Sequence, residues 1–398
     1  MEHKKNQFPV YIQACGSHSA LGNNTETILK RLQGQEASDM ERVDGWLNNG
    51  NQTVVGMVKA DLPELPTHLE SYNTRNNRLA LSALVQIEAE VREAIAQYGA
   101  ERVAVIVGTS TSGISDGEAA LKEKLESGAF PKEYHYNQQE LGNPAEFIAD
   151  YFQLSGPCFC ISTACSSSGR VFLSAKRLLK AGLVDAVIAG GVDSLCRLTL
   201  NGFNGLEALS TTHCNPFSLN RDGINIGEAA AFMLLSAVPS ADQIALLGAG
   251  DSSDAHHISA PHPDGVGAEE AMKKALNDAG LTPDDIGYIN AHGTATLLND
   301  AMEGKAIARV FSADTPVSST KPLTGHTLGT ASAMEAAICW YLLKYKSALP
   351  RQINDGQFDA IPLRFVQQDM PLHGKAVLSN SFAFGGNNIS LVFGYADE

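Results

Sequence analysis

The stretch CISTACSSSGR, residues 160–170, sets one cysteine between an apolar run and a helical pattern. The residues before Cys165 are small or β-branched, as in a strand, and VFLSAKRLLKAGL after it carries apolar residues at helical spacing. Backbone N–H groups are free where a strand leads into a helix, so we expect them to stabilise a thiolate and lower its pKa. Three interpretations of Cys165 are considered: a buried small residue, a metal ligand and a nucleophile. Its position at this junction counts in favour of the nucleophile.

The neighbouring cysteines narrow these choices. Cys158 and Cys160 alternate with Phe159 and Ile161, which predicts ordinary buried residues of a strand. A C-x-C pair with a distant third cysteine lacks zinc-ligand spacing, and no nearby histidine completes it. No metal is expected, and the buried and nucleophilic interpretations of Cys165 both stay open.

Composition excludes several classes of function. The chain has 398 residues, 44% of them hydrophobic, and a formal net charge of −15, so a basic nucleic-acid-binding face is not expected. We expect no membrane span and no signal peptide, because no apolar run is long enough. Seven cysteines without framework spacing favour free thiols in a reducing cytoplasm.

Buried strands and amphipathic helices alternate along the chain, which predicts a layered α/β protein. Around residue 240 the rhythm starts again, so we expect two similar halves, residues 1–240 and 241–398, that share one body. Strands are expected at 8–16, 102–108, 158–163, 185–195, 243–250, 286–290, 375–386 and 388–395. Helices are expected at 24–35, 76–98, 143–154, 167–183, 267–281, 299–311 and 331–345.

Three further stretches supply groups that a thiolate acyl-transfer site needs for proton handling and carbonyl polarisation. INAHGTAT puts His292 just after an apolar strand, and SSTKPLTGHTLG holds Lys321 and His326 in a polar loop. Each has an ordinary alternative, a hydrogen-bonded structural histidine or a solvated lysine. Glu335 lies within the apolar helix ASAMEAAICW, and because a buried carboxylate needs a partner, Lys321 is the candidate.

The motifs STACSSS, NAHGTAT, STKPLTGHTLG and SNSFAFGGNN occur in this order and together resemble the condensing β-ketoacyl-acyl-carrier-protein synthases. The resemblance covers nearly the whole chain and implies a thiolase-like fold, with duplicated halves in five α-β-α-β-α layers. It implies decarboxylative Claisen condensation of an acyl thioester with malonyl-ACP. It also implies an acyl carrier protein as partner, no cofactor, and either a homodimer or a heterodimer with a chain-length-factor-like subunit.

The resemblance also implies roles for individual residues. Cys165 carries the acyl group, His292 and His326 polarise the malonyl thioester carbonyl, and Lys321 and Glu335 support them. The backbone N–H groups of Cys165 and Phe384 form an oxyanion hole, with Phe384 as a gating residue. A structural monovalent cation is implied near Asn290, Glu335, Ser379 and Asn380. Carrier docking is expected at Arg75 and Arg78, with Lys122 and Lys124 as further candidates.

The chain departs from the family pattern in its closing motif, where Ala383 replaces a glycine and Asn387 a threonine. These departures leave pathway and substrate open between fatty-acid, type II polyketide and aryl polyene synthesis.

Rival classes fit the sequence less well. A papain-like hydrolase lacks its local signature, a thiolase lacks its second cysteine, and third-type synthases lack the Lys321–His326 motif. A chain-length factor typically loses the nucleophile, whereas this chain keeps Cys165.

Overall fold

The computed structural model describes residues 7–396. Their largest sheet has 11 strands in the order β12-β11-β10-β13-β14-β9-β1-β8-β6-β4-β5. The two halves of this sheet meet where β1 pairs with β9 over only Val10–Leu246 and Tyr11–Ala245. The strands are β1 (Val10–Ser19), β4 (Val103–Gly108), β5 (Cys158–Ile161), β6 (Ala186–Asp193), β8 (Ala229–Ser236), β9 (Ile244–Ser253), β10 (Ile286–Asn290), β11 (Pro316–Ser318), β12 (Arg364–Phe365), β13 (Ala376–Phe382) and β14 (Asn387–Tyr395).

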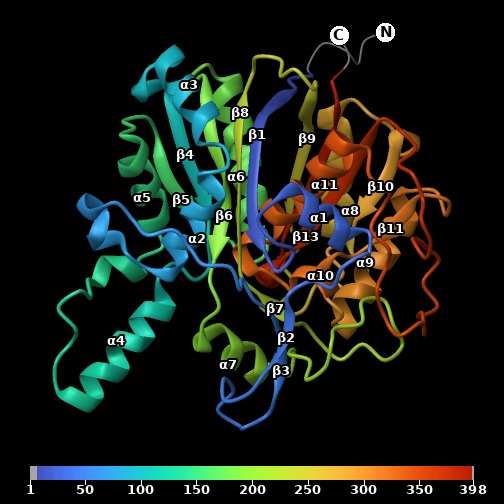
Figure 1. Cartoon of the computed structure of the whole chain (residues 1–398). Coiled ribbons are helices and arrows are strands. Elements are labelled where there is room, and N and C mark those ends of the chain that lie inside the picture. Colours follow the sequence, from blue (N-terminus) through green and yellow to red (C-terminus); the bar gives the residue numbers. More distant parts are fainter. Residues whose placement is uncertain (1–6, 397–398) are drawn as a thin grey trace.

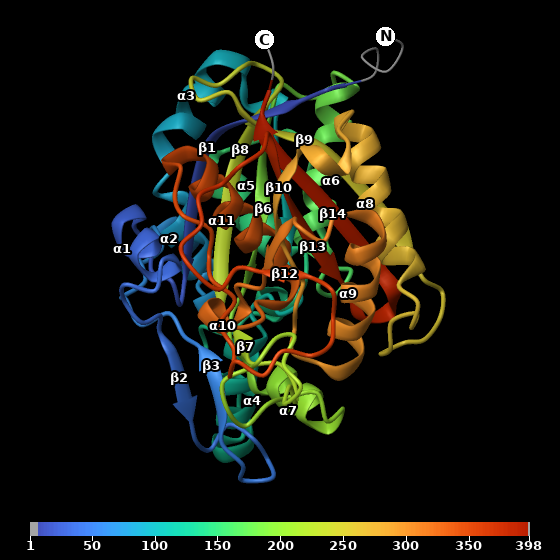
Figure 2. The same ribbon diagram turned by 90° about the vertical axis from the view of Figure 1, so that its right-hand side faces the viewer.

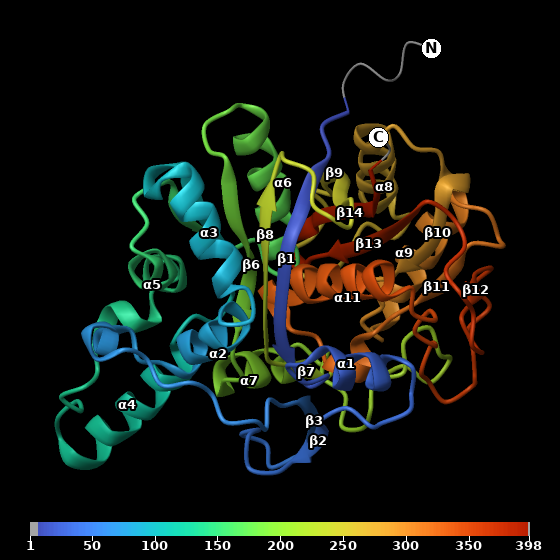
Figure 3. The ribbon, with the colours of Figure 1, turned by 45° about the horizontal axis from the view of Figure 1, so that its top comes forward.

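Helices cover both outer faces of the sheet and fill the space between its halves (Figures 1 and 3). The central layer holds α6 (Ser167–Lys180) and α11 (Ala331–Tyr345), which contact strands of both halves. One outer layer holds α2 (Arg75–Leu84), α3 (Glu88–Tyr98) and α5 (Asn143–Phe152), and the other holds α8 (Val266–Ala279) and α9 (Leu297–Val310). This is the predicted five-layer order.

Burial on both faces explains why the central strands are continuous apolar runs. Every residue of β4, β6, β8 and β13 is buried. Helix α11 shows the same effect, since Ala331 through Leu343 are all buried in the central layer. Its one acidic residue, Glu335, is thus held inside the protein.

A smaller region lies below the large sheet in Figure 1, beside helices α4 (Ile114–Ser127) and α7 (Arg197–Gly205). It contains a three-stranded sheet of β2 (Met40–Val43), β3 (Thr53–Gly56) and β7 (Ile226–Gly227). Helix α1 (Thr25–Leu32) lies above β2 and β3 in Figure 2, beside α2. Helix α10 (Lys321–Thr324) links this region to the central layer.

Three expectations from the sequence are corrected. The helix expected over residues 76–98 is two helices, and the backbone leaves the helical conformation at Ile87, where φ is −122° and ψ is 12°. Just before it, the Gln86 side chain exchanges hydrogen bonds with both backbone groups of Ser17 in β1. Strand β8 and helices α4 and α7 were not anticipated. Cys158 and Cys160 were expected to be buried, but Cys158 is exposed and Cys160 is half-buried, since β5 is the last strand of the sheet and has one open edge.

Within residues 7–396, no helix combines the length and the apolar composition that crossing a membrane takes.

Candidate active site

Cys165 lies in a tight turn between β5 and α6 and is 6% exposed. Ala164 before it has a φ of 53°, a left-handed conformation that costs free energy for a non-glycine residue. Serine hydroxyls of the next helix hold the turn: Ser167 Oγ donates to Ala164 O at 2.5 Å and accepts the Thr163 N–H at 2.9 Å. The small polar residues around the cysteine therefore fix the direction of its thiol.

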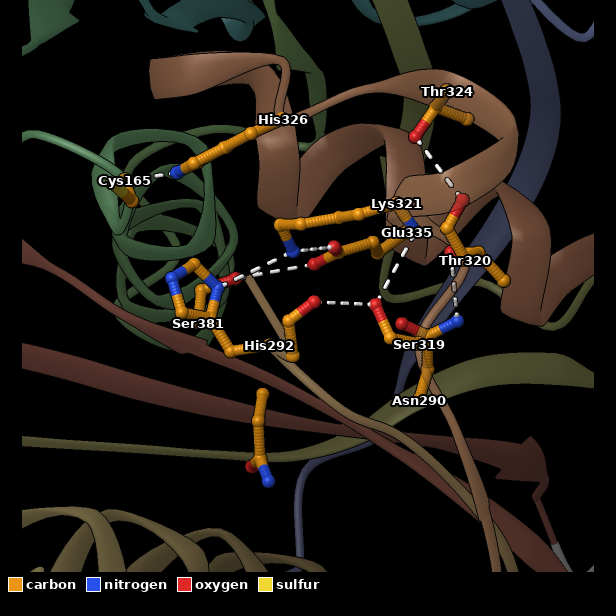
Figure 4. A network of polar contacts seen from close by, with 12 residues as sticks. Cys165, Asn290, His292, Ser319, Thr320, Lys321, Thr324, His326, Glu335 and Ser381 are labelled. Carbon is orange, nitrogen blue, oxygen red and sulfur yellow. Dashed lines mark hydrogen bonds and ion pairs between the residues drawn. The ribbon is translucent and has the colours of Figure 1, made fainter. Parts of the chain in front are cut away.

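His326 is the nearest titratable neighbour of the thiol (Figure 4). Its Nε2 lies 3.0 Å from Cys165 Sγ, and its Nδ1 accepts the backbone N–H of Leu328 at 3.2 Å. An Nδ1 that accepts a hydrogen bond carries no proton in the neutral ring, so the proton is on Nε2. His326 therefore presents an N–H donor to the sulfur.

His292 follows β10 and is oriented in the same way. Its Nδ1 lies 3.4 Å from the Lys321 ammonium, which can only donate, so its proton also belongs on Nε2. Burial, followed by the charge of Lys321, holds the pKa of both His292 and His326 well below the usual value. Both imidazoles are thus neutral near pH 7.

The predicted pair of Lys321 and Glu335 forms in the structure. Lys321 Nζ lies 2.5 Å from Glu335 Oε1, and both side chains are buried. The second carboxylate oxygen of Glu335 accepts the Ser381 hydroxyl at 3.3 Å. Burial raises the pKa of Glu335, while Lys321 and Ser381 oppose that rise. The buried ion pair keeps the ammonium directed at His292.

The expected depression of the cysteine pKa is corrected. Burial raises the pKa of Cys165 to about 11, although Lys321 and the backbone N–H groups of Phe384 and Cys165 itself act to lower it. The free N–H groups at the turn are present as predicted, but the loss of water around the thiol is the larger effect. Cys165 is therefore a protonated thiol at neutral pH.

Sequence analysis missed two buried carboxylates on α9. Glu303 accepts the backbone N–H groups of His292 at 2.8 Å and Gly293 at 2.7 Å, and burial raises its pKa to about 7. Asp300 accepts the N–H groups of Ala295 and Phe217. Their spacing of three residues within NDAMEG, on one face of a helix, was the available signal. Together they fix the loop that carries His292.

A third missed residue, Asp193, joins the two halves at the C-terminal end of β6. Its fully buried carboxylate accepts N–H and hydroxyl groups of Thr109–Thr111 on one side and Thr330 on the other. Thr330 follows the loop of His326, so Asp193 anchors that loop to the half that carries Cys165. In the sequence, Asp193 is only the last residue of the strand segment GGVD, and no pattern there indicates this role.

A cavity of about 270 Å³ opens above Cys165, His292 and His326. Its walls are largely apolar, and Phe384 lies against Phe203 with ring centroids 5.7 Å apart. Exposed apolar side chains lie along its mouth; they are Leu206, Leu297 and Leu298. The site can thus receive a narrow, partly apolar chain that ends at the thiol.

The four residues expected around a monovalent cation do not all offer a side-chain oxygen that is free to bind it. Asn290 Oδ1 is buried without a hydrogen-bond partner among the described residues. The Glu335 carboxylate is bound by Lys321, and Asn380 Oδ1 accepts the Ser390 hydroxyl at 2.7 Å. Ser379 is buried on β13, whose end adjoins that of β10. The side chains therefore do not fit a cation held by all four residues.

A transition metal also fits the triad poorly. The ligand atoms of Cys165, His292 and His326 lie within 4.8 Å of one another, near enough to share an ion. Metal-binding histidines, however, donate their second ring N–H to an acceptor. A neutral histidine that binds a metal through Nε2 carries its proton on Nδ1. Here the Leu328 N–H and the Lys321 ammonium already donate to the two Nδ1 atoms, so two donors would face each other at each ring.

The residues predicted for carrier docking differ in their surroundings. Arg75 pairs with the fully buried carboxylate of Glu228 at 2.5 Å, which gives it a role in the interior. Arg78 pairs with exposed Glu64 at 2.9 Å. Lys122 is exposed on α4, and Lys124 lies over the Phe130 ring. That these four residues bind the carrier protein stays a prediction.

The gating segment runs from Phe382 through Asn388 and contains the short 3₁₀ turn Phe384–Gly386. Ala383 has an ordinary extended backbone, with φ −100° and ψ 153°, so its position does not require glycine. Asn387 Oδ1 accepts a hydrogen bond from Arg170 at 3.3 Å. Both departures from the family motif are therefore accommodated without strain.

Comparisons with known proteins cover the whole chain. Residues 8–241 match the N-terminal domain of beta-ketoacyl synthase, and residues 244–354 match its C-terminal domain. Nodulation protein E of Rhizobium meliloti (strain 1021) is 32% identical over 96% of this chain and 98% of its own. The 3-oxoacyl-[acyl-carrier-protein] synthase 2 of Staphylococcus aureus (strain COL) is 30% identical over 96% and 97%.

Solved structures agree with these matches. A chain in the complex of the ketosynthase ApeO with its chain length factor ApeC, from Xenorhabdus doucetiae, is 49% identical, with a TM-score of 0.93 and complete coverage of both chains. A chain of the ishigamide ketosynthase/chain length factor is 26% identical with a TM-score of 0.86, covering 98% of this chain and 100% of that one. The chain therefore belongs to the beta-ketoacyl synthase family of condensing enzymes.

Proposed function

We propose that Cys165 takes an acyl group from an acyl carrier protein and condenses it with a malonyl group on the same kind of carrier. The product is a β-ketoacyl carrier two carbons longer. The observation that carries this proposal is the pair of Nε2–H donors, on His292 and His326, beside the thiol.

The first half-reaction is a thioester exchange. The Cys165 sulfur attacks the acyl carbonyl carbon, the bond to the carrier sulfur breaks, and the thiol proton leaves with the carrier. The His326 Nε2–H stabilises the sulfur as it loses its proton. The backbone N–H groups of Cys165 and Phe384 are available to the oxygen that gains charge.

The second half-reaction needs charge stabilisation more than a base. Loss of CO₂ from the malonyl group leaves an electron pair that becomes an enolate, whose oxygen can accept the Nε2–H of both histidines. The enolate carbon then attacks the Cys165 thioester, a carbon–carbon bond forms, and the Cys165 sulfur leaves and regains a proton. The neutral tautomers already offer both donors, so the step does not require a protonated histidine.

The rival function of a cysteine hydrolase needs a general base to activate water. Both imidazoles carry their proton on the nitrogen that faces the cavity, so neither offers a free basic nitrogen there. An inactive chain-length factor is disfavoured by the retained Cys165. Condensation is the reaction that uses every group at the site.

We also propose that the chain works in the cytoplasm with a chain-length-factor-like partner, and that its pathway is of the type II polyketide or aryl polyene kind. The ApeO–ApeC and ishigamide complexes support the partner. Seven free thiols support a reducing setting. A homodimer remains the alternative that the family resemblance implies.

The test is a product assay with acyl carrier and malonyl carrier, with and without the candidate partner. We expect β-ketoacyl carrier and CO₂ in equal amounts from the wild-type chain, and no β-ketoacyl carrier from Cys165→Ala. Release of free fatty acid without CO₂ would support the hydrolase instead.

A further inference from the structure

We propose that Arg170 is a positioning residue for the oxyanion hole and acts through Asn387. The inference rests on the proposed function, because it assigns Arg170 to holding the Phe384 N–H in place beside Cys165. It concerns a contact between the nucleophile's helix and the gating segment.

Arg170 lies in the first part of α6, the helix that follows Cys165. Its guanidinium reaches three acceptors: Asp251 Oδ2 at 2.7 Å, the Ser252 carbonyl at 3.3 Å and Asn387 Oδ1 at 3.3 Å. Asp251 and Ser252 belong to β9, and Asn387 begins β14. One side chain therefore joins the nucleophile's helix to two strands of the other half.

Asn387 directly follows the turn that begins with Phe384. The turn is closed by backbone hydrogen bonds from Ala383 N–H to Asn387 O at 2.8 Å and from Gly386 N–H to Ala383 O at 3.1 Å. Gly385 and Gly386 have φ values of 81° and 76°, so the segment between has wide conformational freedom when unrestrained. Fixing Asn387 therefore limits where the Phe384 N–H can lie.

The rest of the segment is bound to β9 and to the loop that follows it. Asn388 Nδ2 donates to Asp254 Oδ1 at 2.7 Å, and the Asp254 N–H donates to Gly386 O at 2.8 Å. Asn388 Nδ2 also donates to Ser252 Oγ at 3.2 Å, and Asn387 and Asn388 pair with Ser253 and Ser252 of β9. These bonds fix the segment to its own half of the protein, whereas the Arg170 bond joins it to the helix of Cys165. Arg170 thus sets the distance between the thiol and the N–H that faces it.

The identity of residue 387 matters for this contact. An asparagine carries its oxygen two bonds from Cβ, whereas a threonine, the family residue in this motif, carries its oxygen on Cβ itself. With the backbone unmoved, a threonine hydroxyl falls short of the Arg170 guanidinium, which already lies 3.3 Å from the asparagine oxygen. Arg170 and Asn387 are therefore expected to act as a pair.

The test compares Arg170→Met, Asn387→Thr and the double variant with Arg177→Met as control. Arg170→Met keeps the aliphatic stem and removes the donors, and Arg177 is an exposed arginine on the same helix. Three quantities are measured: backbone amide hydrogen exchange over residues 382–388, the single-turnover rate of acyl transfer to Cys165, and its rate of alkylation by iodoacetamide.

We expect faster amide exchange and about tenfold slower acyl transfer in each single variant, because a misplaced donor weakens oxyanion stabilisation. The double variant should be no slower than the slower single variant, since both changes break one contact. Alkylation should stay within about twofold, because it needs no oxyanion hole. Arg177→Met should match the wild type throughout.

Unchanged exchange, additive losses in the double variant, or alkylation that falls in step with acyl transfer would each overturn the inference. Faster exchange with unchanged acyl transfer would do so as well. Should the wild-type chain transfer no acyl group, the proposed function fails, and amide exchange still decides whether Arg170 holds the segment.

Discussion

The rings of His292 and His326 are almost perpendicular, at 88°, with centroids 5.3 Å apart. Donors occupy both Nδ1 atoms, so both Nε2–H groups face the cavity beside Cys165. An oxygen atom between them can accept two hydrogen bonds at once. This geometry distinguishes the two half-reactions, since only the second develops a full enolate charge there.

Replacing His326 by alanine should therefore impair decarboxylation more than acylation. We expect CO₂ release from malonyl carrier to fall by about 100-fold, the usual cost of one oxyanion donor, and acylation of Cys165 to fall less. Single-turnover acylation and CO₂ release are measured on the same preparation. His326→Gln, whose amide can restore a donor, should recover part of the loss, and equal loss in both steps would contradict the assigned role.

Removing the ammonium of Lys321 should destabilise the fold, because the Glu335 carboxylate would remain buried without its partner. For Lys321→Met we expect a loss of about 3–5 kcal/mol in the free energy of unfolding, measured with urea. The double variant Lys321→Met/Glu335→Leu should regain much of that stability but no activity. A double variant as unstable as the single one would contradict a stabilising role of the ion pair.

Glu303 should give the condensation rate a dependence on pH near neutrality. Its pKa is raised to about 7, so the carboxylate that accepts the His292 and Gly293 N–H groups becomes more populated as pH rises from 6 to 8. We expect the rate to rise over that range in the wild type. In Glu303→Gln the rise should vanish and the rate at pH 8 should be about tenfold lower. An unchanged pH profile in the variant would contradict the assignment.

Cys165 should react as a thiol of raised pKa. With a pKa of about 11, its thiolate fraction grows about tenfold per pH unit between pH 7 and 9. Alkylation by iodoacetamide, followed on the Cys165 peptide by mass spectrometry, should rise accordingly. A plateau below pH 8 would show that the N–H groups outweigh burial. A Cys158→Ser background removes the exposed competing thiol.

Carrier docking is best tested at Arg78, since Arg75 supports the buried Glu228 and its reversal would disturb the fold. The double variant Arg78→Glu/Lys122→Glu should raise KM for carrier-bound substrate by about three- to tenfold at low salt, and leave KM for a pantetheine thioester unchanged. Equal KM values for the carrier in variant and wild type would place docking elsewhere, for instance over Leu297 and Leu298.

Sequence reasoning located the residues of the triad and the ion pair, because each lies in a motif of unusual composition. Glu335 was identified by its conflict with an apolar helix, which required a cation nearby. Burial patterns also predicted the central strands other than β8. These signals lie in short stretches of sequence, so they can be recognised without knowledge of the fold.

The remaining features depend on contacts between distant segments. The break between α2 and α3 lies beside Gln86, whose side chain bonds to Ser17, a contact between distant residues that periodicity cannot show. The pKa of Cys165 depends on total burial, and the partner of Asn387 is a residue 217 positions away. Exposure of Cys158 follows from the place of β5 in the sheet, which no local pattern specifies.

The central claim is that Cys165 carries the growing acyl chain between two carrier proteins. Its most direct test is the intact mass of the purified protein, with its candidate partner, after incubation with a panel of acyl carriers and then malonyl carrier. The account predicts one acyl adduct, located on Cys165, that disappears as β-ketoacyl carrier forms. No adduct with any starter, or an adduct that malonyl carrier leaves in place, would contradict it.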